Sequence, residues 1–213
     1  MLCVALPEKS LREKEGGGLI SGWRCGMGTK RLVVGMTGAS GAVLALELLR
    51  RLRDNPEWET HYVMSRGAEI TLDCELPGRK QELLDLADRV YDNSQIGAAI
   101  ASGSFAAAGM VVVPCSMKTV AGIHGGYADT LLLRAADVTV KEGRPLVLVP
   151  RETPLSPIHL RNLYELSMMG VAVLPPVLTF YNGPQTVDDM VEHIVGKILD
   201  RLGIPAEYRR WQG

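Results

Sequence analysis

The stretch RLVVGMTGASGAVLALELLRRLR covers residues 31–53 and decides the fold. Its first part, residues 31–36, is an apolar run that predicts a buried strand. Leucines then recur at helical spacing from 44 to 52, which predicts a helix. Between them lies a turn in which glycines follow one another at three-residue intervals from Gly35. A strand, a tight turn and a helix together form the first half of a βαβ unit.

The same alternation of short strands and longer helices continues along the chain. It predicts an α/β fold in which helices cover both faces of a parallel sheet. Apolar runs such as MVVVP (110–114) and LVLVP (146–150) fit strands that are buried on both sides. The other strands are expected at 60–65 and 171–174, and the remaining helices at 68–76, 79–87, 118–122, 128–140, 156–169 and 187–202.

The composition excludes several classes of protein. The chain has 213 residues, 46% of them hydrophobic, and a formal net charge of −1, which argues against a basic nucleic-acid-binding surface. No apolar run reaches the roughly 18 residues that cross a bilayer, so we expect no membrane segment. The four cysteines form no CxxC pair. We therefore expect no structural zinc, reduced thiols and a cytoplasmic location.

Residues 1–28 differ from the rest of the chain. They are rich in glycine, carry a mixed-charge stretch at 8–15 and sustain no hydrophobic period. They lack the basic and apolar regions of a signal peptide. We interpret them as a disordered extension, or as sequence upstream of an alternative start at Met27. Residues 29–213 are then expected to fold as one domain.

The turn after the first strand is the first candidate binding element. Ligands of open parallel sheets bind beyond the carboxyl ends of the strands. Gly38, Ala39 and Ser40 follow the strand at 31–36 and precede a helix, whose free N–H groups suit a phosphate. The alternative is a plain tight turn with Ser40 as the helix cap.

Polar residues also follow the later strands. Ser65 follows the second, residues 116–119 the third, and Arg151 the strand at 146–150. Taken singly, these are helix caps and a surface ion pair between Arg151 and its neighbour. Taken together, they favour a phosphorylated, planar, mononucleotide-like ligand.

Other chemistries find less support in the sequence. The four histidines show no ligand spacing, so we expect no metal, and no GxSxG motif indicates a hydrolase. Cys115 begins a helix and is either a nucleophile or a small packed side chain. Tyr181 is expected near the end of the last strand, where its hydroxyl could meet a phosphate.

Eight segments together resemble the flavin prenyltransferases of the UbiX type, a group that includes the small subunit associated with hydroxyarylic acid decarboxylases. The likeness runs from about residue 30 to the C-terminus. The segments are GMTGASGA (35–42), HYVMS (61–65), ASGSF (101–105), PCSMKT (114–119), RAADV (134–138), KEGRPLVLVPRETPL (141–155), PPVLTFYNGPQTVDD (175–189) and RW (210–211).

This resemblance implies a fold, an assembly and a reaction. The fold is a flavodoxin-like Rossmann three-layer sandwich with a parallel sheet, assembled as a homo-oligomer, usually a dodecamer. The reaction joins a dimethylallyl group from dimethylallyl monophosphate to N5 and C6 of reduced FMN. No metal is implied. The product, prenylated FMN, serves a separate UbiD-type decarboxylase.

The resemblance also implies roles for individual residues. Tyr181 and Lys197 match positions that bind the dimethylallyl phosphate, and Arg134, Lys141 and Glu152 match a polar cluster around it. Lys141, Arg134 and Lys197 would stabilise the departing phosphate, and Glu152 would take part in proton transfer. The residues that match FMN-binding positions are Gly38, Ala39, Ser40, Ser65, Ser116, Met117, Lys118, Thr119 and Arg151.

The chain departs from the family pattern in two places. Some members carry Arg where this chain has Lys197, which keeps the charge and loses the bidentate fork. Some also carry a Trp shortly before the SGS segment, where this chain has no aromatic residue in Gln95-Ile96-Gly97. The few aromatic residues, 5% of the chain, suggest that neighbouring subunits complete the prenyl pocket.

Two alternative functions remain open at this point. One is a flavin-dependent decarboxylase of peptidyl or pantothenoyl cysteine, which would need a catalytic His after an early strand; here His61 lies within one. The other is a non-catalytic FMN-binding subunit of an aromatic acid decarboxylase. Lys141, Glu152, Tyr181 and Lys197 argue against it, because flavin storage needs no second phosphate site.

Overall fold

A six-stranded parallel sheet forms the centre of the computed structural model, which describes residues 29–211. The expectations for residues 1–28 lie outside the described residues. The strands are β1 (Lys30–Met36), β2 (Trp58–Met64), β3 (Arg89–Tyr91), β4 (Ala107–Cys115), β5 (Leu146–Pro150) and β6 (Ala172–Val173). The helices are α1 (Ala42–Arg53), α2 (Arg66–Glu75), α3 (Lys80–Leu86), α4 (Met117–His124), α5 (Leu131–Lys141), α6 (Pro157–Met168) and α7 (Val187–Arg201), with a 3₁₀ turn at Ala99–Ala101.

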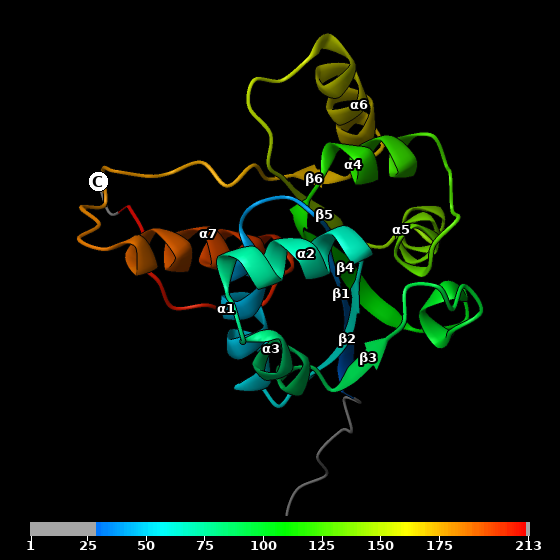
Figure 1. Cartoon of the computed structure of the whole chain (residues 1–213), viewed down its shortest axis with the longest axis horizontal. Coiled ribbons are helices and arrows are strands. Elements are labelled where there is room, and N and C mark those ends of the chain that lie inside the picture. The colour runs from blue at the N-terminus through cyan, green and yellow to red at the C-terminus, as the bar shows by residue number, and fades with distance from the viewer. Residues whose placement is uncertain (1–28, 212–213) are drawn as a thin grey trace, which may run out of the picture.

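Helices cover the sheet on both faces, as Figure 1 shows. Successive side chains of a strand point to opposite faces, so Val34 of β1 packs with α1, α2, α3 and α7, whereas Val33 packs with α4, α5 and α6. Both side chains are almost fully buried. The strands are therefore apolar on both sides, which confirms the expected α/β class with a parallel sheet.

The strand order is β3-β2-β1-β4-β5-β6. Without the short edge strand β3, it is the 2-1-3-4-5 order of flavodoxin. This agrees with the expected flavodoxin-like sandwich. Direction along the sheet reverses between β1 and β4, and the carboxyl ends of these two strands flank a natural crevice.

The edge strand β3 was missing from the sequence prediction. It has only three residues and pairs with β2 alone. Val90 is largely exposed, so the segment has no apolar period to detect. The other strands and helices were predicted within a few residues of their observed limits, except that β4 begins earlier and α5 later than expected. Within residues 29–211, no helix is both long and apolar enough to cross a membrane.

Candidate functional site

The turn after β1 is held against the end of β4 by a buried threonine. The Thr37 hydroxyl donates to the Pro114 carbonyl (3.0 Å) and accepts from the Ser116 amide (2.7 Å). The next residue, Gly38, lies so close to α2 that a Cβ there would come within 2.8–2.9 Å of the Gly67 backbone. Only glycine fits at this position, because the opposing atoms belong to main chain.

Two serines cap helices that begin at this edge of the sheet. Ser65 Oγ accepts from the Ala68 amide (3.1 Å) at the start of α2, and Ser116 Oγ accepts from the Thr119 amide (3.4 Å) at the start of α4. The remaining N–H groups of each helix start, and the positive end of its dipole, suit an anion. The predicted caps are confirmed.

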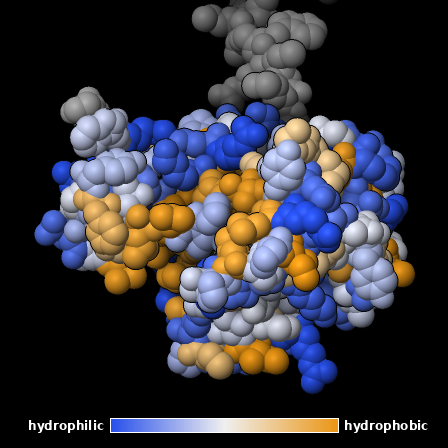
Figure 2. All heavy atoms as spheres, turned by 90° about the horizontal axis from the view of Figure 1, so that it is seen from above, coloured by the Kyte–Doolittle hydropathy of each residue, from blue (hydrophilic) through white to orange (hydrophobic). Residues whose placement is uncertain are grey.

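A cavity of about 400 Å³ lies between these helix starts. It contains five of the predicted flavin-binding residues: Gly38, Ser65, Ser116, Lys118 and Thr119. Figure 2 views the molecule from the side on which α6 projects in Figure 1, and apolar side chains gather there between polar rims. The helix starts suit a phosphate, and Leu132 and Leu133 provide the apolar part of a lining that is otherwise mostly polar.

Four further residues of this cavity were not found from the sequence: Arg66, Asn93, Asp129 and Thr130. Thr130 caps α5, because its Oγ1 accepts a hydrogen bond from the Leu133 amide (3.4 Å). A threonine directly before an apolar helix is a signal in the sequence that could have predicted this cap. Asn93 accepts from the Leu132 amide (2.9 Å) across 39 residues, a pairing with no local signal.

The start of α1 differs from the prediction. Its amides were expected to be free for a phosphate, or capped by Ser40. Instead the Glu75 carboxylate accepts from the amides of Gly41 (2.9 Å) and Ala42 (2.7 Å). Burial favours the neutral acid, but hydrogen bonds from Ser40, Gly41 and Ala42 outweigh it and lower the pKa of Glu75. This carboxylate, beside Ser40, was missed because it lies 34 residues away in sequence.

Three residues that the sequence analysis considered as binding or catalytic residues are buried in the protein interior. Ala39 and Met117 are buried, and Met117 packs in the core beneath α4 and α5. Cys115 is fully buried, and burial raises the pKa of its thiol well above the ordinary value. A thiol of this kind is a poor nucleophile, which favours the packing interpretation of Cys115.

Arg151 and Glu152 follow β5 and are exposed. The Arg151 amide donates to the Cys115 carbonyl (3.2 Å), which places it beside the end of β4. Its positive charge also helps to lower the pKa of Glu75. Arg151 therefore lies on the Ser40 side of the same strand ends. The Glu152 carboxylate accepts from the next amide in the chain, that of Thr153 (3.1 Å).

Arg134 and Lys141 both lie on α5 and both reach the segment at 101–104. Arg134 Nε donates to the Ala101 carbonyl (3.3 Å), and Lys141 lies beside Gly103 while it pairs with Glu142. Seven residues separate the Cα atoms of Arg134 and Lys141 by about 10 Å along the helix axis. Lys141 is thus at the end of α5 that points away from the cavity.

Tyr181 and Lys197 lie in another part of the molecule. Lys197 is exposed on α7, and Tyr181 packs its ring edge against His193 of the same helix (6.4 Å between centroids). Because α7 and α5 cover opposite faces of the sheet, one chain does not bring this pair together with Arg134 and Lys141.

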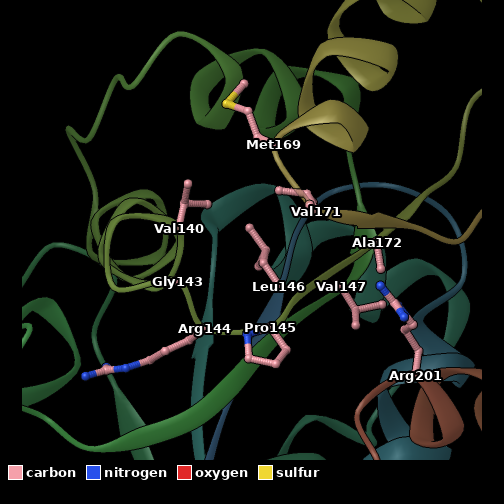
Figure 3. A pocket seen from close by; sticks show the side chains of 11 residues that line it. Val140, Gly143, Arg144, Pro145, Leu146, Val147, Met169, Val171, Ala172 and Arg201 are labelled. Atoms are coloured by element: carbon pink, nitrogen blue, oxygen red, sulfur yellow. The ribbon is translucent and has the colours of Figure 1, made fainter.

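A second cavity, of about 310 Å³, lies at the amino ends of the strands, at the opposite end of the sheet from the first cavity. Figure 3 shows that Leu146, Val147 and Ala172, at the amino ends of β5 and β6, surround it. Arg144 extends away and donates to the carbonyls of Gly103 and Phe105 (2.7 Å each). Ligands of parallel sheets bind at the other end, so this cavity is not a candidate active site. Among residues 29–211, no three His, Cys, Asp or Glu side chains are grouped as a metal site.

Comparisons with known proteins agree with this geometry. The family model described as Flavoprotein matches residues 25–199. A probable UbiX-like flavin prenyltransferase of Escherichia coli O157:H7 is 55% identical over 86% of this chain and 93% of its own length. The chain belongs to the UbiX-like flavin prenyltransferase family. Another member, the flavin prenyltransferase LpdB of Lactiplantibacillus plantarum, is 54% identical over 86% of this chain and 99% of its own.

Solved structures of UbiX-like proteins share the fold as well as the sequence. A dodecameric FMN-dependent UbiX-like decarboxylase from Escherichia coli O157:H7 superposes with a TM-score of 0.84 at 55% identity, over 86% of this chain and 100% of the other. AnUbiX (PadA1), solved with FMN and dimethylallyl pyrophosphate, gives a TM-score of 0.84 at 46% identity, over 86% of this chain and 98% of the other. The expected UbiX-type family and fold are confirmed.

For the alternative function, a cysteine decarboxylase, the comparison shows only a shared fold. The peptidyl-cysteine decarboxylase EpiD is 18% identical, with a TM-score of 0.55 over 70% of this UbiX-like chain and 83% of its own. At that identity the likeness concerns the architecture alone. His61, the only early-strand histidine, lies inside β2 rather than after it, against Tyr91 and Phe105.

Proposed function

We propose that this protein transfers a dimethylallyl group from dimethylallyl monophosphate to reduced FMN. The observation that carries the proposal is the cavity at the ends of β1 and β4. There Gly38 packs against Gly67 of α2, and the starts of α2 and α4 line one cavity in which their N–H groups would suit an anion. Reduced FMN would supply the nucleophilic N5 and C6 atoms. Ser65, Ser116 and Thr119 would hold its phosphate, and Ser40 and Arg151 would face the ring.

The reaction needs a second phosphate site with positive charge. The C–O bond of the donor breaks, inorganic phosphate leaves with the electron pair, and the dimethylallyl carbon forms its first bond to N5. The proton that N5 loses passes to the released phosphate. Lys141, Arg134 and Lys197 would stabilise the departing phosphate electrostatically, and Tyr181 would donate a hydrogen bond to it. Because side-chain cations can neutralise a leaving monophosphate, the proposal needs no metal.

Glu152 is the proposed proton-transfer residue. It is exposed and directly follows Arg151, at the end of β5. Its carboxylate is free to move, because its one hydrogen bond in the described residues is to the adjacent Thr153 amide. To close the new ring, the prenyl double bond takes up a proton, C6 bonds to the cationic carbon that results, and C6 then loses its proton. A carboxylic group at this position could donate the first proton and accept the second.

The separation of Arg134 and Lys141 from Tyr181 and Lys197 supports a shared site between copies of the chain. The two pairs lie on opposite faces of one sheet. We therefore propose a homo-oligomer, dodecameric like the structure from Escherichia coli, in which neighbouring chains bring the pairs together. The product would pass to a UbiD-type decarboxylase, and the reaction would take place in the cytoplasm.

The test is to incubate the purified chain, without oxygen, with reduced FMN and dimethylallyl monophosphate. We expect a flavin heavier by one five-carbon unit by mass spectrometry. The pyrophosphate, which was bound to AnUbiX, serves as the comparison donor. A flavin that is bound but unchanged with both donors would overturn the proposal and favour the non-catalytic FMN-binding subunit.

A further inference from the structure

The outer side of α7 carries a cluster of polar and aromatic contacts around Tyr181 and Lys197. The α7 residues at positions 196, 197 and 200 lie three, four and seven residues after His193, so the four share one side of the helix. The loop before α7 and the tail after it both pack onto this side. Apart from Tyr181 and Lys197, the residues in these contacts have no part in the proposed mechanism.

Asn182 joins the Tyr181 loop to α7. It is 8% exposed, although Tyr181 before it is 59% exposed. Its Nδ2 donates to Nδ1 of His193 (3.3 Å), which is itself 5% exposed. This buried hydrogen bond links the loop to the helix one turn before Lys197.

His193 also forms the centre of an aromatic row. Its ring meets Tyr181 edge-on at 6.4 Å between centroids and Tyr208 edge-on at 5.3 Å. The other side of Tyr181 meets Trp211 at 5.3 Å. Edge-to-face pairs at these separations are favourable. His193 therefore contacts both a loop residue, Tyr181, and a tail residue, Tyr208.

Tyr208 anchors the tail next to Lys197. Its ring lies on Gly196, where a Cβ would come within 2.2–2.7 Å of ring carbons. Its hydroxyl donates to Asp200 (2.5 Å), and Arg210 donates to both oxygens of the same carboxylate (2.5 and 2.6 Å). The hydrogen bonds from Arg210 contribute most to lowering the pKa of Asp200, and Lys197 adds its charge.

We propose that His193 is a positioning residue that holds Tyr181 and Lys197 at the spacing needed to bind one phosphate group. It does so by accepting the Asn182 hydrogen bond and by supporting the Tyr181 ring. His193 itself touches no reacting atom. This inference rests on the proposed function, because it gives Tyr181 and Lys197 the donor phosphate as their common ligand.

The test replaces His193 in two ways in the full-length chain. His193→Leu keeps similar bulk but removes the acceptor and the ring, and we expect it to raise KM for dimethylallyl monophosphate about tenfold. His193→Gln offers Oε1 to Asn182, and we expect KM to return to within about threefold of wild type. Neither change should alter kcat or the Kd for FMN.

Two further variants separate positioning from loss of stability. Ile194→Val, in the core beside His193, is the matched control: it should lower stability without raising KM for the donor. Tyr208→Leu removes the aromatic ring by which the chain tail contacts His193. We expect it to raise KM about threefold to tenfold even if His193→Leu fails to fold.

Direct titration of the donor into FMN-loaded protein distinguishes this inference from the proposed function. If wild type makes prenylated flavin and both His193→Leu and Tyr208→Leu keep its KM, the positioning role is refuted and the function stands. If wild type binds the donor without turnover and the two variants bind it less tightly, the function fails and the positioning role stands. If wild type does not bind the donor, both are refuted.

Discussion

The cavity at the ends of β1 and β4 and the outer side of α7 hold their functional groups by different means. The cavity is formed by main chain and by short capping side chains, such as Ser65 and Ser116, which are immobilised by their own helices. The α7 side presents two long exposed side chains, Tyr181 and Lys197, that only neighbouring contacts can orient. Most substitutions leave a site formed by main chain unchanged, and only changes at its glycines alter it. A site formed by long side chains can be altered one residue at a time.

Glu152→Gln tests whether the rate of the reaction can be lowered without changing the binding of FMN. General acid–base groups contribute at least about 100-fold to rate, so we expect kcat to fall by about that factor. The Kd for FMN should stay near its wild-type value, because the amide keeps the size of the carboxylate and the predicted FMN-binding residues are unchanged. Anaerobic single-turnover kinetics measure the rate. An unchanged rate would remove Glu152 from the mechanism.

Gly38→Ala tests the backbone region. A Cβ at 2.8–2.9 Å from the Gly67 main chain forces the turn away from α2. Overpacking of this kind costs about 1–3 kcal/mol, and we expect FMN to bind about 10- to 100-fold more weakly. Flavin fluorescence titration measures the Kd. Gly97→Ala is the control, since a Cβ there meets no atom within 4 Å and should leave the Kd unchanged.

Lys197→Ala tests the side-chain region. Losing one charged hydrogen bond to a phosphate costs about 1.5–3 kcal/mol, so KM for the donor should rise at least about tenfold. FMN binding should not change, because Lys197 does not line the cavity between the starts of α2 and α4. Lys197→Arg keeps the charge and should restore most of the affinity. A loss confined to FMN binding would contradict the comparison.

His61 provides a change that should affect neither region. Burial lowers its pKa below the usual 6.5, although Glu59 opposes the shift. The unfolded chain therefore binds a proton first as the pH falls, so the free energy of unfolding decreases below about pH 6.5 and levels off below the folded pKa.

The slope from one such group is at most about 1.4 kcal/mol per pH unit. His61→Gln should flatten the slope in urea unfolding measured between pH 5 and 8, with FMN and donor affinities unchanged. Equal slopes in wild type and variant would exclude His61 as its source. A loss of FMN affinity would show that the centre of β2 and the cavity are not independent.

The parts that could be predicted from the sequence are those with local signals. Ser65 and Ser116 each directly precede a helix, and their capping bonds span only three residues. Glu75 and Asn93 could not be found in this way, because each bonds to a helix start more than 30 residues away. Likewise β3 was missed because three half-exposed residues carry no period.

By itself, the sequence determined the alternation of strands and helices, the caps at the strand ends and the membership of the UbiX-like family. These depend on hydrophobic period, short-range hydrogen bonds and residue identity, all of which are present in the chain before it folds. Only the tertiary structure decided that Glu75 occupies the start of α1 and that α5 and α7 carry their cations on opposite faces. Such neighbours arise from packing between distant segments, whose free energy no local pattern records.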